Sequence, residues 1–382
     1  MKVGIANLLK LLVNTAEKGA NVARIIRSDA DLLNLLVEEK KGDSKNQRFV
    51  QDFKTLADVL VQEIVRHDLS EEIPDIKGSI YGEESNTFTN ALGESITVEI
   101  QSTKQQTTDL LSQVLDGNVR AAELLAREAH ESVVVDTGNG LEKLVGLEED
   151  VEDLGVWIDP IDSTAQYIGG LQGTIEDCGI ASEGLQCVVV IIGVYNKHTG
   201  LPLVGVTNQP FATYDALSER WIGESMWGVC VGDTRVNSLS KESINNPRDK
   251  PIILMSTSES EDVQNTFRKK SSIHYAAGAG YKLLCAIQGL ADSYILSKSS
   301  TYKWDACGPH AILLSIGGGL ISFKNLKDAD LQGSETLVRD LQIRYHKADR
   351  PGASGADKWC NDGGVVAYTS SAMLKTIKEI IV

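Results

Sequence analysis

The chain has 382 residues, of which 42% are hydrophobic and 24% are charged, and its formal net charge is −16. This length can bury a large core and predicts two lobes, and the ordinary composition argues against extensive disorder. The negative charge argues against a nucleic-acid backbone or an anionic membrane as the main partner. Small anionic substrates remain compatible with it, because bound cations can invert the local field.

No apolar run reaches the roughly 18 residues that a membrane-spanning helix needs. In the N-terminal block Leu8–Val13, Lys10 interrupts the apolar residues, which favours an amphipathic helix over a secretory signal. The six cysteines show no paired spacing, as expected in a reducing compartment. We therefore expect a cytoplasmic protein.

The first part of the chain reads mainly as helices. Helical spacing of apolar residues predicts helices over residues 1 to about 40, over 55–65 and over 104–131, and a short strand leads into a turn at 80–85. From residue 156 the pattern changes to strands. Apolar runs predict a strand at 156–158, a hairpin formed by 187–195 and 201–207, and a second hairpin within 220–231.

A polar segment rich in turn residues, 245–251, is the predicted boundary between an N-terminal lobe, 1–245, and a C-terminal lobe, 246–382. Beyond it, strands and helices alternate. The predicted strands are 252–256, 293–296, 320–323 and 365–368, and the predicted helices are 259–269, 281–290, 305–316 and one at the end of the chain. This order indicates an α+β lobe followed by an α/β lobe.

The most informative motif is the turn from Asp159 to Thr164, which follows the apolar run Val156–Ile158. It combines two carboxylates, a proline and two hydroxyl groups, and it leads into a short predicted helix. The acids can hold a divalent cation, and the first free amides of the helix can bind an anion. Asp162 could also serve only as the N-cap of that helix.

Three further acidic sites lie beside apolar or glycine-rich segments: Asp52, the pair Glu83 and Glu84, and Asp305. Singly, each has a simple alternative, since Asp305 can be an N-cap and the glutamates a solvated turn. Together, converging carboxylates would repel one another without a cation. Oxygen ligands without a cluster of His and Cys favour Mg²⁺ over zinc.

These residues resemble a known superfamily, the lithium-sensitive, magnesium-dependent phosphomonoesterases. The resemblance rests on the segments 82–85, 157–164 and Trp304-Asp305, which occur in the same order. Within the superfamily, the sequence most resembles the inositol polyphosphate 1-phosphatase branch, as indicated by Ser163 and the segments 193–195, 208–210 and 276–282. The resemblance implies a layered α-β-α-β-α sandwich of the inositol monophosphatase and fructose-bisphosphatase type.

The resemblance also implies two to three Mg²⁺ ions. Glu83, Asp159 and the Ile161 carbonyl would hold the first ion. Asp159, Asp162 and Asp305 would hold the second, and Glu83 would share a third. The resemblance also implies Asp52 and Glu84 as candidate metal ligands.

By the same resemblance, the catalytic residues are Asp52, Thr164 and Glu83, with Thr164 and Asp52 orienting and deprotonating the attacking water. The candidate substrate-binding residues are Asp162, Ser163, Thr164, Ser258, Gly278, Ala279 and Lys282. Two departures from the pattern stand out. Ser260 occupies a position where we expect a lysine, and Pro309 falls early in a predicted helix, where it is tolerated.

The glycines near 278–280 lack the third glycine of a dinucleotide fingerprint. Cys307 and His310 could face one way on a helix, but no further soft ligands point to a zinc site. We interpret His198 and His274 as loop residues rather than catalytic bases.

The predicted function is Mg²⁺-dependent removal of the 1-phosphate from inositol 1,4-bisphosphate and inositol 1,3,4-trisphosphate, with inhibition by lithium. The partners would be these small molecules, with no nucleic acid and no membrane, and a monomer is expected. Two alternatives are a 3′(2′),5′-bisphosphate nucleotidase, against which Ser163 counts, and a catalytically silent phosphoinositide-binding protein.

Overall fold

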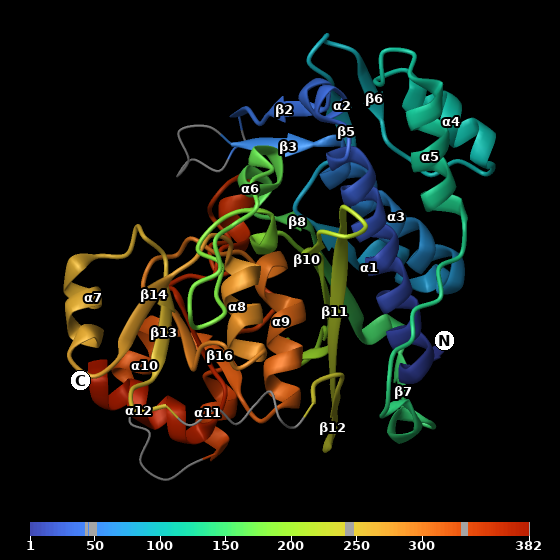
Figure 1. The fold of residues 1–382 in the computed structure, drawn as a ribbon. Helices are drawn as coiled ribbons and strands as arrows, with labels where there is room; N and C mark the ends of the chain where they lie inside the picture. Colours follow the sequence, from blue (N-terminus) through green and yellow to red (C-terminus); the bar gives the residue numbers. More distant parts are fainter. Residues whose placement is uncertain (43–44, 46–51, 241–247, 330–334, 382) are drawn as a thin grey trace.

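The computed structural model describes residues 1–42, 45, 52–240, 248–329 and 335–381, so the predicted lobe boundary at 245/246 lies outside the described residues. Figure 1 shows the arrangement of the elements. The helices are α1 Ile5–Arg27, α2 Ala30–Leu35, α3 Leu56–Glu72, α4 Lys104–Ser112, α5 Val119–His130, α6 Thr164–Gly169, α7 Glu261–Arg268, α8 Ala279–Ile287, α9 Lys303–Ser315, α10 Phe323–Asp328, α11 Glu335–Asp340 and α12 Ser371–Ile381.

Two larger sheets carry the fold. The first has the order β12-β11-β10-β9-β8-β4 and the second the order β14-β13-β15-β17-β16. Their strands are β4 Ile80–Gly82, β8 Leu154–Asp162, β9 Val189–Asn196, β10 Pro202–Asp215, β11 Arg220–Val231, β12 Thr234–Asn237, β13 Ile252–Met255, β14 Ser272–Tyr275, β15 Ser293–Leu296, β16 Gly319–Ser322 and β17 Val365–Tyr368. Shorter pairs are formed by β1 Lys2–Gly4 with β7 Glu148–Asp150, β2 Val37–Glu39 with β3 Phe53–Thr55, and β5 Thr87–Thr89 with β6 Ser95–Thr97.

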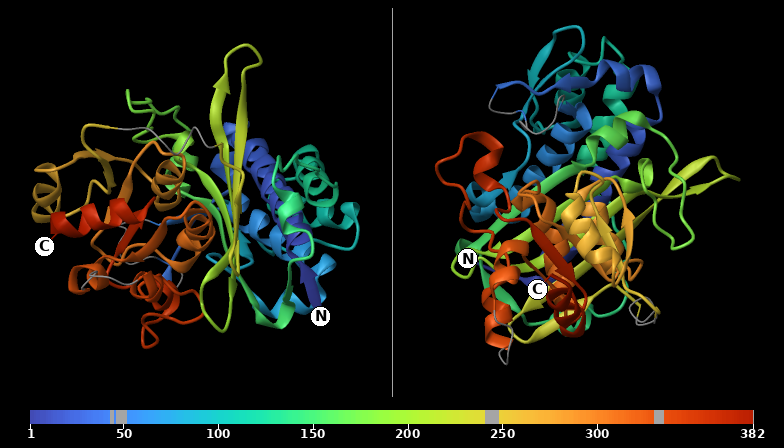
Figure 2. Two further views of the ribbon diagram at one scale, coloured as in Figure 1. Left: turned by 90° about the horizontal axis from the view of Figure 1, so that it is seen from below. Right: turned by 90° about the vertical axis from the view of Figure 1, so that its left-hand side faces the viewer.

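The elements stack in five layers. Helices α1 and α3 cover one face of the first sheet, and α8 and α9 lie between the two sheets. Helices α7, α10 and α12 cover the outer face of the second sheet. Figure 2 shows the blue helices on one side of the long strands and the orange and red elements on the other. The predicted α-β-α-β-α sandwich is therefore confirmed.

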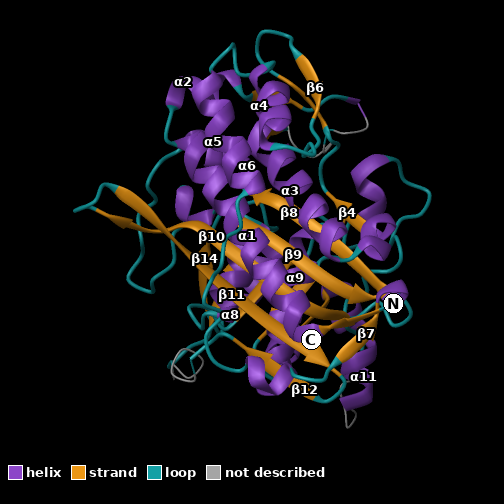
Figure 3. Ribbon diagram, turned by 90° about the vertical axis from the view of Figure 1, so that its right-hand side faces the viewer, coloured by secondary structure: helices purple, strands orange, loops and turns teal. Residues whose placement is uncertain are grey.

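The first sheet is antiparallel except for β4, which runs parallel to β8. Figure 3 shows its long strands lying side by side. Its edge toward β4 holds the acidic motifs, because β8 ends in Asp162 and β4 leads directly into Glu83. Parallel pairing of β4 with β8 therefore brings two acidic segments, far apart in sequence, to the same end of the sheet.

Helix α9 packs closely on this sheet through glycine. A Cβ atom at Gly193 of β9 would lie 2.4 Å from the Gly308 nitrogen, and one at Gly205 of β10 would lie 1.9 Å from the Gly308 oxygen. The helix continues through Pro309, as predicted. This close packing positions the first turn of α9, and with it Asp305, toward the first sheet.

Two strands of the larger sheets differ from the sequence-based prediction. The segment 220–231 is one long strand, β11, which pairs with β10 and β12, and not a hairpin. The strand β14 was missed, because Ser272–Tyr275 lies at a sheet edge and contains polar residues that do not form an apolar run. Among the described residues, none of the helices combines the length and the apolar character of a membrane-spanning segment.

Candidate active site

The end of β8 directs two aspartates toward one site. In a regular strand, residues three apart point to opposite faces. The pairing of β8 with β9 shifts register between Asp159 and Asp162, and such an irregularity re-aims side chains. Both aspartates are buried, with 1% and 8% of their surface exposed. The shift explains how the motif Asp159–Asp162 can supply two carboxylates to the same place.

Two further carboxylates come from neighbouring elements. The Glu83 amide donates to the Ile158 carbonyl at 3.2 Å, which places Glu83 beside the end of β8. Asp305 is the third residue of α9, and its carboxylate accepts a hydrogen bond from the Tyr302 amide at 2.9 Å. The N-cap of α9 is Tyr302, so Asp305 is not the N-cap but the third helical residue of a capping box. Its side chain also belongs to the acidic cluster.

The carboxylates influence one another strongly. Burial raises the pKa of Asp159 well above its ordinary value, and the carboxylates of Glu83, Asp162 and Asp305 raise it further. Burial and the charges of Asp162 and Glu83 likewise raise the pKa of Asp305. The pKa of Asp162 rises to about 6, mainly through burial, although Lys282 opposes the increase. These carboxylates therefore share an environment that disfavours their charged forms.

This cluster fits a cation. Asp159 Oδ1 is buried and accepts no hydrogen bond from the described residues, which is costly unless a ligand binds there. The donors are carboxylate oxygens, as Mg²⁺ prefers. Within the described residues, no three of these carboxylates place ligand oxygens within 4.8 Å of one another. The cluster is therefore more open than a closed single-ion cage.

A lysine that we did not predict also lies in the acidic cluster. Lys40 Nζ is 2.8 Å from Glu83 Oε1 and forms an ion pair with Glu84. Burial lowers the pKa of Lys40, but the surrounding carboxylates outweigh burial and raise it well above its ordinary value. Burial raises the pKa of Glu84 to about 8 despite this partner. A positive charge is thus already stabilised at this edge of the cluster.

The backbone of Glu84 is fixed by two hydrogen bonds to the Gln62 side chain. Its amide donates to Gln62 Oε1 at 2.9 Å, and Gln62 Nε2 donates to its carbonyl at 2.6 Å. Gln62 lies on α3, so this pair of bonds fixes the turn after β4 against that helix. The glutamates therefore occupy a fixed position and do not form the freely solvated turn considered as an alternative.

The structure corrects the predicted partner of Thr164. The Thr164 hydroxyl donates to Asp58 Oδ1 and to the Ile161 carbonyl, at 3.1 Å in each case. Asp58 is buried in the first turn of α3, where it forms a capping box with Thr55. Asp52, which we had assigned to this role, is half-buried, and its carbonyl accepts from the Lys40 amide at 2.8 Å. The acid next to Thr164 is therefore Asp58, six residues further along.

Ser163 has an unusual backbone conformation. It is the N-cap of α6, and its φ is 74°, in the left-handed region that normally favours glycine. Its side chain makes no capping hydrogen bond, and its Oγ atom is buried without a partner among the described residues. Such a strained residue with an unused hydroxyl is typical of a binding site. Asp162, considered as the N-cap, instead ends β8.

The segment 278–280 lies directly against this turn. The Gly280 amide donates to Asp162 Oδ2 at 3.0 Å. A Cβ atom at Gly278 would lie 2.3 Å from Ser163 Oγ and 2.6 Å from Asp162 Oδ2. Ala279 is the first residue of α8. The structure thus brings the predicted substrate residues Gly278 and Ala279 to the acidic turn.

Lys282 and Ser258 are placed differently from our expectation. Lys282 is buried, and its ammonium group donates to the carbonyls of Ala276 (2.9 Å) and Gly278. It therefore stabilises the backbone of the glycine loop. Burial lowers the pKa of Lys282 to about 8. Ser258 lies exposed after β13, where its carbonyl accepts from Lys298. Ser260 is the N-cap of α7 and accepts from the Val263 amide at 3.4 Å.

His310 is a structural residue. Its two ring nitrogens lie 3.0 Å from the Tyr345 hydroxyl and 2.9 Å from Gln342 Oε1. Both nitrogens are therefore engaged, and burial lowers the pKa of His310 to about 3. This agrees with the sequence-based interpretation that Cys307 and His310 do not form a zinc site.

Comparison with known proteins places this site in a family. The chain matches the Inositol monophosphatase family over residues 8–344. It is 45% identical to mouse "Inositol polyphosphate 1-phosphatase" over 97% of the chain and 96% of that protein. It is 30% identical to human "3'(2'),5'-bisphosphate nucleotidase 1" over 60% of the chain and 64% of that protein.

The fold is also shared with a solved structure, the extragenic suppressor protein suhB from Bartonella henselae, with a TM-score of 0.52, 11% sequence identity and coverage of 98% of each chain. At this low identity the likeness concerns the fold alone. The sequence match over residues 8–344, in contrast, includes Asp58, the whole acidic turn and Asp305. This chain belongs to the inositol monophosphatase family.

Proposed function

We infer that the chain is a phosphomonoesterase with inositol polyphosphate 1-phosphatase activity, and that it acts on inositol 1,4-bisphosphate and inositol 1,3,4-trisphosphate. The similarity to the mouse inositol polyphosphate 1-phosphatase extends over nearly the whole length of both chains, which supports this branch of the family. The observation that carries the catalytic assignment is the hydrogen bond between Thr164 and Asp58, at the end of the strand that holds Asp159 and Asp162.

The acidic cluster would hold Mg²⁺ through Glu83, Asp159, Asp162, Asp305 and the Ile161 carbonyl, with Glu84 beside them. When bound, Mg²⁺ neutralises phosphate charge, activates water and stabilises the leaving oxygen. We expect two to three ions at this cluster. Burial of Asp159 without a hydrogen-bond partner on Oδ1 supports the assignment.

The pair formed by Asp58 and Thr164 would orient the attacking water. The Thr164 hydroxyl donates to Asp58 Oδ1, so its oxygen lone pairs remain available to accept a hydrogen bond from water. Asp58 can then take up the proton through Thr164 as the water attacks. Because the capping box fixes Asp58, the acceptor is held in place before the substrate arrives.

The turn that starts α6 would bind the phosphate. The amides of Ser163 and Thr164 lie at the start of a helix, where free N–H groups favour anions. The Ser163 hydroxyl lies between this turn and the Gly278 loop. A substrate hydroxyl or phosphate oxygen placed there would satisfy it. Gly278 and Ala279 would then contact the inositol ring, supported by Lys282.

A phosphate-release panel tests the proposed function. Purified protein would be given inositol 1,4-bisphosphate, inositol 1,3,4-trisphosphate, inositol 1-phosphate and adenosine 3′,5′-bisphosphate, each with Mg²⁺ and with or without Li⁺. We expect release from the two inositol polyphosphates and inhibition by Li⁺. Preferential release from the adenosine compound would instead support the nucleotidase alternative. Binding without release would support the catalytically silent alternative.

Removal of Mg²⁺ is expected to destabilise the protein increasingly as the pH rises. Below about pH 4 the aspartates are protonated in the folded and in the unfolded state, so their burial does not lower the free energy of unfolding of the metal-free protein. Because the folded pKa of Asp162 is raised to about 6, and those of Asp159 and Asp305 are raised too, metal-free stability is lost as the pH rises through these values. Bound Mg²⁺ offsets this loss.

Differential scanning calorimetry with and without chelator measures this effect. With Mg²⁺ at about 100 times its Kd, binding adds about 2.7 kcal/mol, or about 3 °C in Tm for a chain of this length. The chelator-induced drop in Tm should be larger at about pH 8 than at about pH 5. The variant Asp305→Asn, which keeps an acceptor for the Tyr302 amide, should show a smaller drop. A drop that is independent of pH would contradict this explanation.

Replacing Ser163 by glycine should stabilise the protein and weaken catalysis. Glycine adopts the φ of 74° without the steric cost of about 1 kcal/mol that serine carries there. Loss of the unpaired hydroxyl would remove one hydrogen bond to the substrate, which corresponds to roughly a 10-fold lower kcat/KM. Ser163→Ala is the matched control, because it removes only the hydroxyl. It should lower kcat/KM equally without raising the free energy of unfolding; an unchanged kcat/KM in both variants would exclude the hydroxyl from binding.

A further inference from the structure

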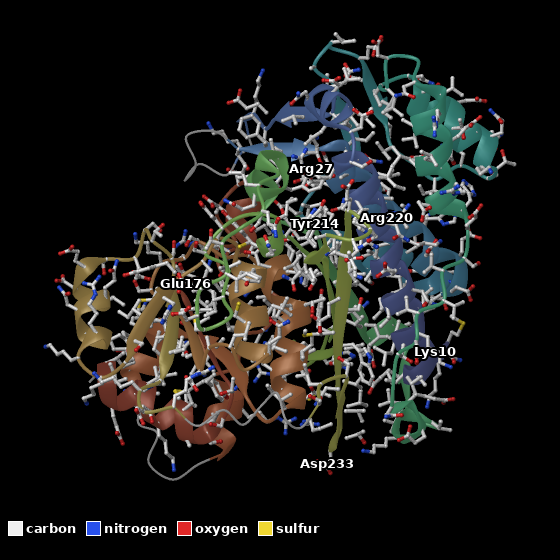
Figure 4. The ribbon with its side chains drawn as sticks, in the orientation of Figure 1. Lys10, Arg27, Glu176, Tyr214, Arg220 and Asp233 are labelled. Atoms are coloured by element: carbon white, nitrogen blue, oxygen red, sulfur yellow. The ribbon has the colours of Figure 1, made fainter. Side chains whose placement is uncertain are left out.

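Outside the acidic cluster, three side chains of different chemistry converge at the surface. They are Glu176 and Cys178, in the loop after α6, and His274 on β14. The atom His274 Nδ1 lies 2.6 Å from Glu176 Oε2 and 3.7 Å from Cys178 Sγ, and that sulfur lies 3.7 Å from Glu176 Oε2. Among the described residues, these three form the one group whose potential metal-ligand atoms all lie within 4.8 Å of one another. Figure 4 shows Glu176 in this loop, beside the second sheet.

The geometry favours a shared ligand over a proton relay. In a relay, the thiol and the carboxylate would contact opposite nitrogens of the imidazole. Here both contact the same atom, Nδ1. Zinc bonds of about 2.0–2.3 Å in a tetrahedron separate neighbouring ligand atoms by about 3.3–3.7 Å. The two distances to sulfur already match this spacing. His274 Nδ1 and Glu176 Oε2 are now hydrogen-bonded. The distance between them would have to increase by less than about 1 Å to admit an ion.

The loop holds its two ligands in a compact turn. The Glu176 amide donates to the Ile180 carbonyl at 2.8 Å, and the Gly179 amide donates to the Glu176 carbonyl at 2.8 Å. Residues Ile175 and Ala181 also form an isolated β-bridge. These backbone bonds fix the spacing of residues 176 and 178 independently of the side chains. The third ligand, His274, lies on β14 of the second sheet.

Cys178 differs from the other cysteines in its exposure. All six cysteines lie in the described residues, and Cys178 is the one that is not buried. The Glu176 side chain is 39% exposed and the His274 side chain is 26% exposed, so an ion can reach the group from solvent. The cysteine thiolate and the glutamate together carry two negative charges, which balance one divalent cation bound with a neutral histidine.

We propose that Glu176, Cys178 and His274 form a binding site for a thiophilic divalent cation, with Zn²⁺ as the best match. Sulfur and imidazole ligands select zinc over Mg²⁺, so this site differs in chemistry from the acidic cluster. Three protein ligands leave a fourth position for water. On binding, the cysteine loses its proton to solvent and the metal gains a sulfur bond.

The site would connect the loop after α6 to the strand that leads into the glycine loop. His274 lies four residues before Gly278, and the Ala277 amide donates to the Ser182 carbonyl at 2.9 Å. An ion at the site would therefore restrain two segments that border the acidic turn. It should raise the Tm of the Mg²⁺-loaded protein, because it binds the folded state in preference to the unfolded state.

Cobalt(II) serves as the probe, because a Co²⁺ thiolate absorbs in the near ultraviolet by charge transfer and a carboxylate site does not. Mg²⁺-saturated full-length protein would be titrated with Co²⁺ in thiol-free buffer. We expect an absorption band that saturates at one equivalent and is removed by one equivalent of Zn²⁺. The variant Cys178→Ser should lose the band, and His274→Gln should weaken Co²⁺ binding at least about 10-fold.

The matched control is His198→Gln. His198 Nε2 also lies 2.6 Å from a carboxylate oxygen, Asp153 Oδ1. Among the described residues this pair does not belong to a group of three potential ligands, so the band should be unchanged. Absence of the band in the wild type, or its persistence in Cys178→Ser, would overturn the proposal. If Cys178→Ser does not fold, His274→Gln decides, because an unchanged Co²⁺ affinity in that folded variant would also overturn it. None of these outcomes depends on phosphatase activity, so the proposed function is tested separately.

Discussion

Replacing Asp58 by asparagine is expected to lower kcat by about 10²-fold to 10⁴-fold, the usual contribution of a positioned general base. The fold should survive, because Asp58 Oδ2 accepts from the Thr55 amide at 2.7 Å and from the Thr55 hydroxyl at 2.6 Å. The asparagine oxygen can keep these bonds. Its NH₂ group then faces Thr164, where it cannot accept the hydroxyl proton. Activity, and not stability, should therefore change most.

The comparison with Asp52→Asn decides between the two acids. We expect Asp52→Asn to retain most of the wild-type kcat, because Thr164 donates to Asp58. Thr164→Ala should lose activity to a similar extent as Asp58→Asn, and the double variant should be little worse than either, since the two residues act as one unit. Thr164→Ser should recover activity. Loss of activity in Asp52→Asn, together with an active Asp58→Asn, would restore the original assignment.

The pH dependence gives an independent measurement. Burial raises the pKa of Asp58 to about 6, although the hydrogen bonds from Thr55 oppose the increase. A base must be ionised to accept a proton, so kcat of the wild type should fall as the pH decreases through this value. The residual activity of Asp58→Asn should lack this dependence on the Asp58 carboxylate.

The sequence contained the right acid but did not identify it. Asp52 and Asp58 are both present in the sequence, and the prediction of Asp52 as the catalytic acid rests on the resemblance to the family. The pattern Thr55-x-x-Asp58 is a capping-box signature at the start of a helix. That signature predicts a fixed, buried carboxylate, whereas Asp52 is half-buried and directly precedes β3. The capping-box pattern at the start of this helix therefore indicates Asp58 rather than Asp52.

Other parts of the site depend on long-range pairing and could not be predicted in this way. The acidic turn was recognisable because its residues are adjacent in sequence. The position of Lys40 between Glu83 and Glu84 depends instead on three segments meeting in space. The same holds for Lys282, whose ammonium group turns toward the carbonyls of its own loop. A sequence pattern indicates which residues can carry chemistry, but not which of them neutralise one another.

The layered fold was predictable for a related reason. Helices with strongly periodic apolar residues and strands with apolar runs can be recognised from the sequence alone, and their order indicates how they stack. β14 was missed because it is an edge strand whose four residues are not buried, so its sequence lacks an apolar run. This omission had a consequence for the site, since His274, interpreted as a loop residue, lies on that strand opposite Leu254.

The second large effect is expected at Gly278. The variant Gly278→Ala should lower kcat/KM by about 10²-fold, the loss that a misplacement of about 1 Å can cause in an active site. At Gly278, φ is 74° and ψ is 137°, a combination that residues with a Cβ atom rarely adopt. The added methyl group would also lie 2.3 Å from Ser163 Oγ and 2.6 Å from Asp162 Oδ2. Two proposed substrate contacts and one proposed metal ligand would have to move together.

Gly138→Ala is the control that separates strain from displacement. Gly138 has a φ of 71°, but a Cβ atom there would meet no heavy atom within 4 Å. Gly138→Ala should lose about 1 kcal/mol of stability through backbone strain, measured by urea unfolding. Gly278→Ala should lose more, because its methyl group also meets Ser163 and Asp162, but only Gly278→Ala should lose activity beyond this destabilisation. If both lost activity equally, general destabilisation would be the cause. If neither did, the contact between the glycine loop and the turn at Asp162 would have no catalytic importance, because a methyl group between them could not leave both in place.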